Sequence, residues 1–235
     1  MADAEEWLRQ HMKGKIAART EQATSQGLIG IAMDGAKAAI VEIRTQTDFG
    51  ARSPQYVAMV GAVAKLAIKG PAGPVKPTAD MTQLIDDVSM TTREAVKFAR
   101  GEKLEGGAFG KYIHHDGKRA ALLQVSGPAD EALLTGICQH IVAHDPPPLG
   151  VSEADVPAAT LERVRREAQQ EAAESGKPPE IAKKMAEGKV RKFLGENTLL
   201  DQIYVRDTAA KSTIRQILPS GLTVKRFVRY TLGAD

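Results

Sequence analysis

The sequence is poor in cysteine and in aromatic residues, has no excess charge of one sign and contains no long apolar run. Its single cysteine, Cys138, cannot form an internal disulfide, and no basic-then-apolar signal appears within residues 2–14. We therefore expect a cytoplasmic protein rather than a secreted disulfide scaffold. The most apolar stretch, 56–68, is interrupted by Gly61 and Lys65 and is too short to cross a bilayer, so no membrane association is expected.

The sequence does contain enough apolar residues for folded cores. Hydrophobic residues make up 43% of the 235 positions, which suits one large domain or two small ones and argues against wholesale disorder. The 32 Lys and Arg residues nearly balance the 29 Asp and Glu residues. The resulting net charge of +3 gives little reason to expect direct nucleic-acid binding, which depends on clustered basic residues.

The first part of the chain predicts a strand, a second strand and a helix. β-favouring runs at 28–33 and 38–44 are separated by a Gly-containing break that is typical of a hairpin. Pro54 can occupy the first turn of the following helix. The apolar positions of that helix share one face, which we expect to cover the hairpin: Tyr56, Val60, Val63 and Ala67.

The order strand, strand, helix recurs further along the chain. Residues 108–114 and 120–125 are interpreted as strands around a turn, and 129–144 as a helix that ends before three prolines. Residues 78–100, between the two units, are expected to be helical with ill-defined ends. The recurrence is architectural, because no position-by-position repeat links the two halves.

Two strongly helical stretches follow, 157–175 and 179–194, and predict an antiparallel hairpin of helices. Their apolar positions form two narrow stripes at coiled-coil-like spacing: Leu161, Val164, Ala168 and Ala172 on the first helix, and Ala182, Ala186, Val190 and Phe193 on the second. After the hairpin, 202–205 is expected to be extended, 209–218 helical, and 222–232 a strand that joins a sheet begun earlier.

These elements predict an α+β fold with two small strand-strand-helix core subdomains and a protruding antiparallel helical hairpin. The expected boundaries are 1–27 for a remnant N-terminal helix and linker, 28–105 for the first core subdomain, 106–156 for the start of the second, 157–195 for the helical hairpin and 196–235 for the completion of the second subdomain.

No arrangement of residues predicts a metal site, a cofactor or covalent catalysis. Cys138 and His140 lack further ligands at helical spacing, and His140 is interpreted as a packing residue. The glycines within 101–110 lack the Lys-Ser/Thr ending of a phosphate loop, and no nucleophile elbow is present, so an enzyme is not expected. The basic residues of 183–192 favour a solvated helix face over an RNA-binding stripe.

Residues 45–53, expected to form a short loop, contain the distinctive motif Thr-Asp-Phe-Gly. Two interpretations are open. Phe49 can fold back onto the core while Asp48 caps a turn, which is the common outcome for an aromatic residue in a loop. Alternatively, the ring protrudes as a wedge that anchors a partner. His114 and His115, at a strand end, also have two open interpretations, as ordinary turn residues or as functional ones.

Several motifs, in order along the chain, resemble those of bacterial elongation factor Ts. They are TQTDF at 45–49, YIHH at 112–115, SGKPPEIA at 175–182 with MAEGK at 185–189 and KF at 192–193, and the 202–205 segment followed by KST at 211–213. The first and third are fairly specific, and the resemblance runs from about residue 5 to 233.

The resemblance implies a guanine-nucleotide exchange factor that acts on elongation factor Tu in protein biosynthesis, with no cofactor and no covalent step. In the family, the motif of Thr47, Asp48 and Phe49 enters the partner's nucleotide domain and disturbs its magnesium site. His114 is expected to press on the same domain, and Val205 to end a segment that touches the partner elsewhere. Self-association through the helical hairpin is left open, and neither a membrane nor a nucleic acid is expected as a partner.

The sequence departs from the family pattern at several places. Family members begin with a three-helix domain, and only its last helix is matched here, at 4–12. The family's Ile-Gly-Glu-Asn segment is replaced by TREA at 92–95, and Gly50 stands where an apolar residue commonly follows the Phe. The alternative hypothesis is a paralogue that binds elongation factor Tu without promoting exchange, as a scaffold or sequestering module.

Overall fold

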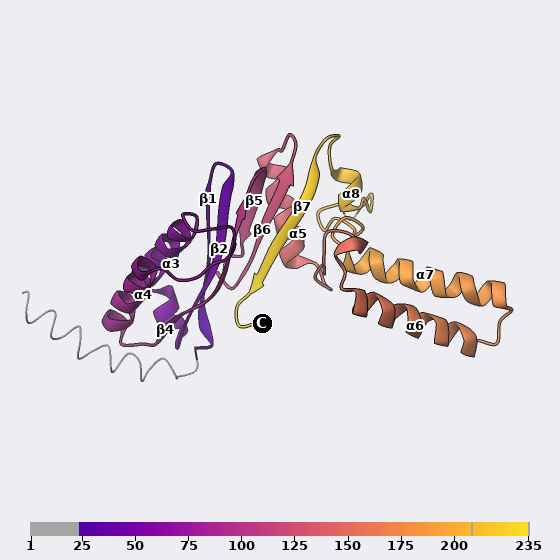
Figure 1. Cartoon of the computed structure of the whole chain (residues 1–235), viewed down its shortest axis with the longest axis horizontal. Coiled ribbons are helices and arrows are strands. Elements are labelled where there is room, and N and C mark those ends of the chain that lie inside the picture. The colour runs from indigo at the N-terminus through magenta and orange to yellow at the C-terminus, as the bar shows by residue number, and fades with distance from the viewer. Residues whose placement is uncertain (1–23, 208, 235) are drawn as a thin grey trace, which may run out of the picture. The chain divides into compact units, whose positions relative to one another are not determined.

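The computed structural model describes residues 24–207 and 209–234 (Figure 1). The helix expected at 4–12 and most of the expected linker lie outside these residues. The chain divides into two compact units: unit 1 extends to Gln124 and also takes in Val228–Asp235, and unit 2 is Val125–Phe227. In the described part of the chain, no helix has the length and apolar character needed to cross a bilayer. The expected α+β fold class is confirmed.

Unit 1 is built on a four-stranded sheet. Its strands are β1 (Gln26–Asp34), β2 (Lys37–Thr45), the short β3 (Gly73–Pro74) and β4 (Val96–Glu105), in the antiparallel order β1-β2-β4-β3. The predicted hairpin of β1 and β2 is confirmed, with Asp34 opposite Lys37 at its turn.

Helices α3 (Pro54–Ala67) and α4 (Ala79–Thr92) cover one face of this sheet (Figure 1). The predicted face of α3 is confirmed, because its four apolar positions are all buried against the sheet. The Ser53 hydroxyl caps the helix by accepting from the Tyr56 N–H, and Pro54 occupies its first turn as expected. The opposite face of the sheet packs in a second cluster: Ile29, Ala38, Ile40, Leu104, Phe109, Ala120, Leu122 and Tyr230.

A second sheet has the order β5-β6-β7, with β5 at Ala108–Ile113, β6 at Arg119–Ser126 and β7 at Thr223–Thr231. β6 and β7 each run from one unit into the other. The strand expected at 222–232 therefore joins an earlier sheet, as predicted. Unit 2 also contains α5 (Glu131–Ala143), a single 3-10 turn η1 (Glu153–Asp155) and the short α8 (Ile214–Ile217).

The predicted antiparallel pair of helices is confirmed as α6 (Ala158–Glu174) and α7 (Pro179–Asn197), which lie side by side (Figure 1). Small side chains fill the seam between them: Ala168, Ala172 and Ala186 are buried, with Ala182, Met185 and Val190 packed against them. Lys189 pairs with Glu171 across the seam. Gly176, with φ of 65°, allows the turn between the helices.

Four sequence predictions of elements are wrong. The helix expected at 78–100 ends at Thr92, and the rest of that range begins strand β4. The loop expected at 45–53 contains the five-residue helix α2 (Asp48–Arg52). The helix expected at 209–218 is limited to α8, and 202–205 is extended only at an isolated bridge from Ile203 to Thr213.

Strand β4 could not be recognised from an apolar pattern, because several of its residues are charged. In the folded protein these charges have partners. Lys103 is buried, with its ammonium group bonded to the Gly70 carbonyl and the Glu105 carboxylate. Arg100 reaches the fully buried Glu42, with 2.8 Å between Nε and Oε2. Such pairing permits charged residues at inward positions that an apolar pattern cannot predict.

Candidate functional site

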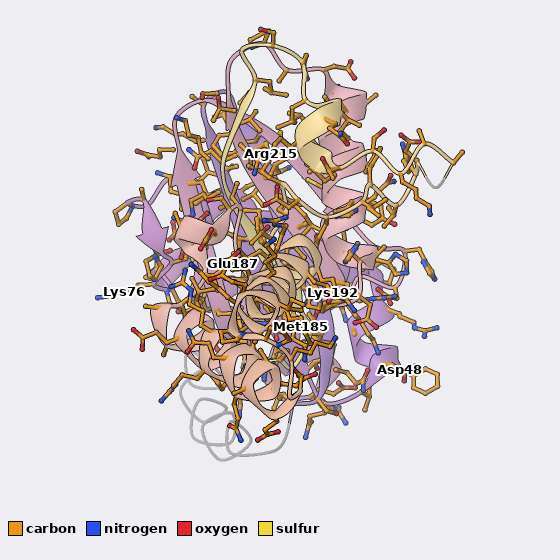
Figure 2. All side chains as sticks on the ribbon, turned by 90° about the vertical axis from the view of Figure 1, so that its right-hand side faces the viewer. Asp48, Lys76, Met185, Glu187, Lys192 and Arg215 are labelled. Carbon is orange, nitrogen blue, oxygen red and sulfur yellow. The ribbon has the colours of Figure 1, made fainter. Side chains whose placement is uncertain are left out.

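The motif at 47–50 is held at the start of helix α2. Thr47 is the N-cap, and its Oγ1 accepts from the Gly50 N–H at 3.0 Å. Asp48 follows in the first turn, and its Oδ2 lies 3.5 Å from a guanidinium nitrogen of Arg52. The two residues form an exposed ion pair one turn apart. In Figure 2 the Asp48 side chain lies on the outside of the ribbon. The cap is therefore provided by Thr47 rather than by Asp48.

Phe49 protrudes from α2 into solvent. Phe49 is 84% exposed, the largest exposed fraction among the exposed large apolar residues of the described chain. The interpretation of Phe49 as a core residue is therefore wrong. An exposed ring on a capped helical turn has the geometry of an anchor for a partner's pocket, because burying it on binding removes a large apolar area from water.

His114 lies just after β5, in the turn that leads to β6. Its backbone N–H donates to the Arg119 carbonyl at 2.8 Å, and its Nδ1 is 3.1 Å from the Tyr112 hydroxyl. The ring of His115 is close by, with 4.2 Å between ring centroids. Next to them, burial acts to raise the pKa of Asp116, but the Lys118 N–H, Arg119 and His114 together hold that pKa below its ordinary value.

The structure brings Asp48 and His114 to one hollow on unit 1. This hollow, about 900 Å³ in volume, lies between β1, the α2–α3 region and the turn after β5. Two exposed apolar residues not predicted from the sequence also line it: Val57 is 50% exposed and Ile113 is 37% exposed. The sequence did hint at Val57 as a contact residue, because it is apolar but lies outside the buried face of α3.

Val205 belongs to unit 2, whereas Asp48, Phe49 and His114 belong to unit 1. Its N–H donates to Nδ1 of His140 at 3.3 Å, and Nε2 of His140 is 3.0 Å from Oε1 of Gln202. Burial lowers the pKa of His140 to about 4, and His144 lowers it further, against the opposing effect of the Gln202 bond. His140 therefore holds the 202–205 segment in place, in agreement with its interpretation as a packing residue.

The site offers contacts rather than reactive groups. Within residues 24–207 and 209–234, no three His, Cys, Asp or Glu side chains are grouped as metal ligands. The residues that the structure does gather are one protruding ring, a carboxylate, a histidine and two exposed apolar side chains. Such a set suits recognition of another protein surface.

Comparison with known proteins identifies the family. Residues 46–234 match the family model described as elongation factor TS. The elongation factor Ts of Levilactobacillus brevis is 35% identical over 245 residues, which covers 99% of this chain and 82% of that protein. The elongation factor Ts of Nitratidesulfovibrio vulgaris strain Hildenborough is 34% identical, over 100% of this chain and 86% of that protein, and that of Ruegeria sp. is 33% identical. The chain therefore belongs to the elongation factor Ts family of translation elongation factors.

Proposed function

We propose that this chain binds elongation factor Tu carrying GDP and promotes the release of GDP, so that GTP can bind. The observation that carries the proposal is the exposure of Phe49, which is 84% open to solvent on a capped helical turn. Asp48 and His114, which line the hollow beside it, are proposed as contacts with the same nucleotide domain. Val205, in unit 2, is proposed as a separate contact with the partner.

The proposed activity needs no covalent chemistry. A protein that binds the nucleotide-free partner more tightly than the nucleotide-bound one lowers the partner's affinity for nucleotide by the same factor. The partner's Mg²⁺ neutralises much of the charge on the diphosphate. Insertion of Asp48 and Phe49 near that ion would displace it, so a small local movement would weaken GDP binding greatly.

The direct test is the rate at which a fluorescent GDP leaves elongation factor Tu of the same organism at increasing concentrations of this protein. We expect an acceleration that saturates with concentration. Binding without acceleration would favour the alternative, a scaffold or sequestering module. Absence of binding would contradict both.

Phe49→Ala tests the wedge itself. Because the ring is exposed, its removal should leave the melting temperature nearly unchanged, whereas truncation of a buried Phe costs roughly 3–5 kcal/mol. The same variant should slow GDP release by about tenfold or more, the expected effect of losing an interface anchor. Met33→Ala is the matched control, since Met33 is 39% exposed and does not line the hollow. An unchanged release rate in a folded Phe49→Ala protein contradicts the wedge.

A further inference from the structure

The short helix that carries Phe49 needs support from outside itself. α2 has five residues, far fewer than a helix needs to be stable alone in water. The ring of Phe49 provides no anchor on this chain, because it is 84% exposed. On the C-terminal side of the ring, α2 is held by Ala51, which is buried in the core of unit 1. The direction of the ring therefore also depends on what holds Thr47, on its N-terminal side.

The side chain that holds Thr47 is Glu94, which follows α4. Its Oε1 accepts from the Thr47 hydroxyl at 2.6 Å. Its Oε2 accepts from the Thr47 N–H at 3.2 Å and from the Thr45 hydroxyl at 2.9 Å. Since the Thr47 hydroxyl gives its only proton to Glu94, its lone pairs are free to accept from the Gly50 N–H. The cap of α2 is thus oriented by the carboxylate of a residue far away in the sequence.

Gly50 leaves the space in which this carboxylate sits. A Cβ built at position 50 would lie 2.4 Å from Oε2 and 2.9 Å from Oε1 of Glu94. Gly50 is buried and helical, so a side chain at this position would have to displace the Glu94 carboxylate rather than strain the backbone. Of the segment 92–95, it is Glu94, the position that keeps the family's Glu, that lies against Gly50.

Glu94 is itself well fixed. Its carbonyl accepts from the hydroxyl of the buried Ser89 at 2.6 Å. The next residue, Ala95, donates its N–H to the Gln46 side chain at 3.0 Å. Strand β4 begins directly afterwards, with Val96 opposite Thr45 of β2. The carboxylate is therefore attached to the sheet and to α4 rather than to a free loop.

We propose that Glu94 is a positioning residue for nucleotide exchange, whose carboxylate fixes the helix that presents Phe49 to elongation factor Tu. This inference rests on the function proposed above and adds to it a residue that does not touch the partner's nucleotide. Glu94 acts through Thr47 and Gly50, and without its carboxylate α2 loses the acceptor that orients its cap. The ring of Phe49 would then be presented in many directions instead of one.

The first experiment compares Glu94→Ala with the intact protein in the GDP-release assay. The maximal release rate at saturating protein should fall roughly tenfold to a hundredfold, the loss that a misplacement of about 1 Å can cause. The half-saturating concentration should change less, because the other contacts with the partner remain. Glu94→Gln, which keeps one acceptor oxygen, should recover part of the lost rate.

Asp34→Ala provides a charge-matched control. It removes an exposed carboxylate at the turn between β1 and β2, at the opposite end of β2 from Thr45. Its release rate should equal that of the intact protein. An unchanged maximal rate in a folded Glu94→Ala protein overturns the proposal. If that variant does not fold, an unchanged maximal rate in Glu94→Gln overturns it.

A double-mutant cycle separates positioning from a general structural role. If Glu94 acts through the ring, Glu94→Ala should cause no further loss of rate in a protein that already carries Phe49→Ala. An equal loss in both backgrounds would mean that Glu94 affects release independently of Phe49, and the proposal would be wrong.

Hydrogen–deuterium exchange tests the same role without the partner. In Glu94→Ala the Gly50 amide should exchange faster, while the amides paired between β2 and β4 stay protected. Unchanged protection at Gly50 overturns the positioning role even where Phe49→Ala slows GDP release. If Phe49→Ala has no effect on release, the proposed wedge function fails, whatever the Gly50 amide does, and the proposal fails with it.

Discussion

At the scale of single residues, the protonation state of His140 is fixed by its neighbours. The Gln202 amide nitrogen donates to the carbonyls of Pro146 and Glu196 at 3.2 and 2.8 Å, so its oxygen is left to accept from Nε2 of His140. Nδ1 of His140 must then accept from the Val205 N–H. A second proton on the ring would face that N–H, so the folded protein requires a neutral imidazole.

Stability should therefore decrease as the pH falls. The pKa of His140 is about 4 in the folded protein against an ordinary value of 6.5, so the unfolded chain binds the extra proton first. The contribution of His140 is complete above about pH 6.5 and is lost progressively as the pH falls toward 4. Urea denaturation should give an unfolding free energy about 2 kcal/mol lower at pH 5 than at pH 7 from this residue.

His140→Gln isolates that effect from the titration of other groups. The variant should be less stable at neutral pH, and its deficit relative to the intact protein should shrink by about 2 kcal/mol between pH 7 and pH 5. Parallel stability curves for the two proteins would show that His140 does not titrate as expected.

The residues of the site could be predicted only in part. The resemblance pointed to Thr47, Asp48 and Phe49, but composition and spacing alone could not decide whether the ring is buried, because burial depends on the capped turn of α2. Glu94 gave no local signal at all. It contacts Thr47 across 47 positions of sequence, and such pairings follow from sheet register rather than from any short pattern.

At the scale of elements, the approach of α3 to the sheet depends on Gly30 of β1. A Cβ built at Gly30 would lie 2.7 Å from Cγ1 of Val60 and 3.0 Å from the Val60 carbonyl oxygen. Because one of these contacts is with backbone, the helix itself would have to move, since a backbone cannot rotate out of the way as a flexible side chain can. Gly61, the next residue on the helix, has open space around its built Cβ.

Alanine substitutions at these two glycines should have opposite effects. Gly30→Ala should lower stability by about 1–3 kcal/mol, because α3 must move away from β1 and loosen its buried face. Gly61→Ala should raise stability by roughly 0.5–1 kcal/mol, since alanine favours the helix interior. Thermal unfolding of both variants checks the pair, and equal shifts in the same direction would contradict the packing argument.

The elements that the sequence predicted correctly are those whose buried face is apolar and periodic. β1, β2, α3, α5, α6 and α7 are of this kind. β4 was missed because Arg100 and Lys103 occupy positions satisfied by partners elsewhere in the fold. α2 and α8 were misjudged because each is one short turn set by a threonine cap, Thr47 or Thr213.

At the scale of the whole chain, the two ends of the helical hairpin are joined to each other. The Leu149 N–H donates to the Asn197 carbonyl at 2.9 Å, and the Leu199 N–H donates to the Gly150 carbonyl at 2.9 Å. Gly150 and Thr198 form a parallel bridge between these bonds. The chain thus enters and leaves α6 and α7 at one place.

Replacement of residues 155–195 by a short Gly-Ser linker should therefore leave a folded protein. The remaining chain keeps the paired ends and the Gln202–Glu196 bond, and a flexible linker adds little closure entropy. The maximal rate of GDP release should be retained, because Phe49 and His114 both belong to unit 1. Circular dichroism and the release assay check both points, and a folded variant with no release activity would show that the hairpin takes part in exchange.

The division of the chain also has a consequence for its synthesis on the ribosome. Unit 1 includes Val228–Asp235, and all of unit 2 is translated before those residues appear. Until then Glu42 lacks the Gly233 N–H, and Arg100 lacks both the Thr231 carbonyl and the ring of Tyr230. The unit that begins to emerge first is thus the one that must wait longest for the last partner of its buried carboxylate, so nascent chains released before β7 would expose an incomplete core.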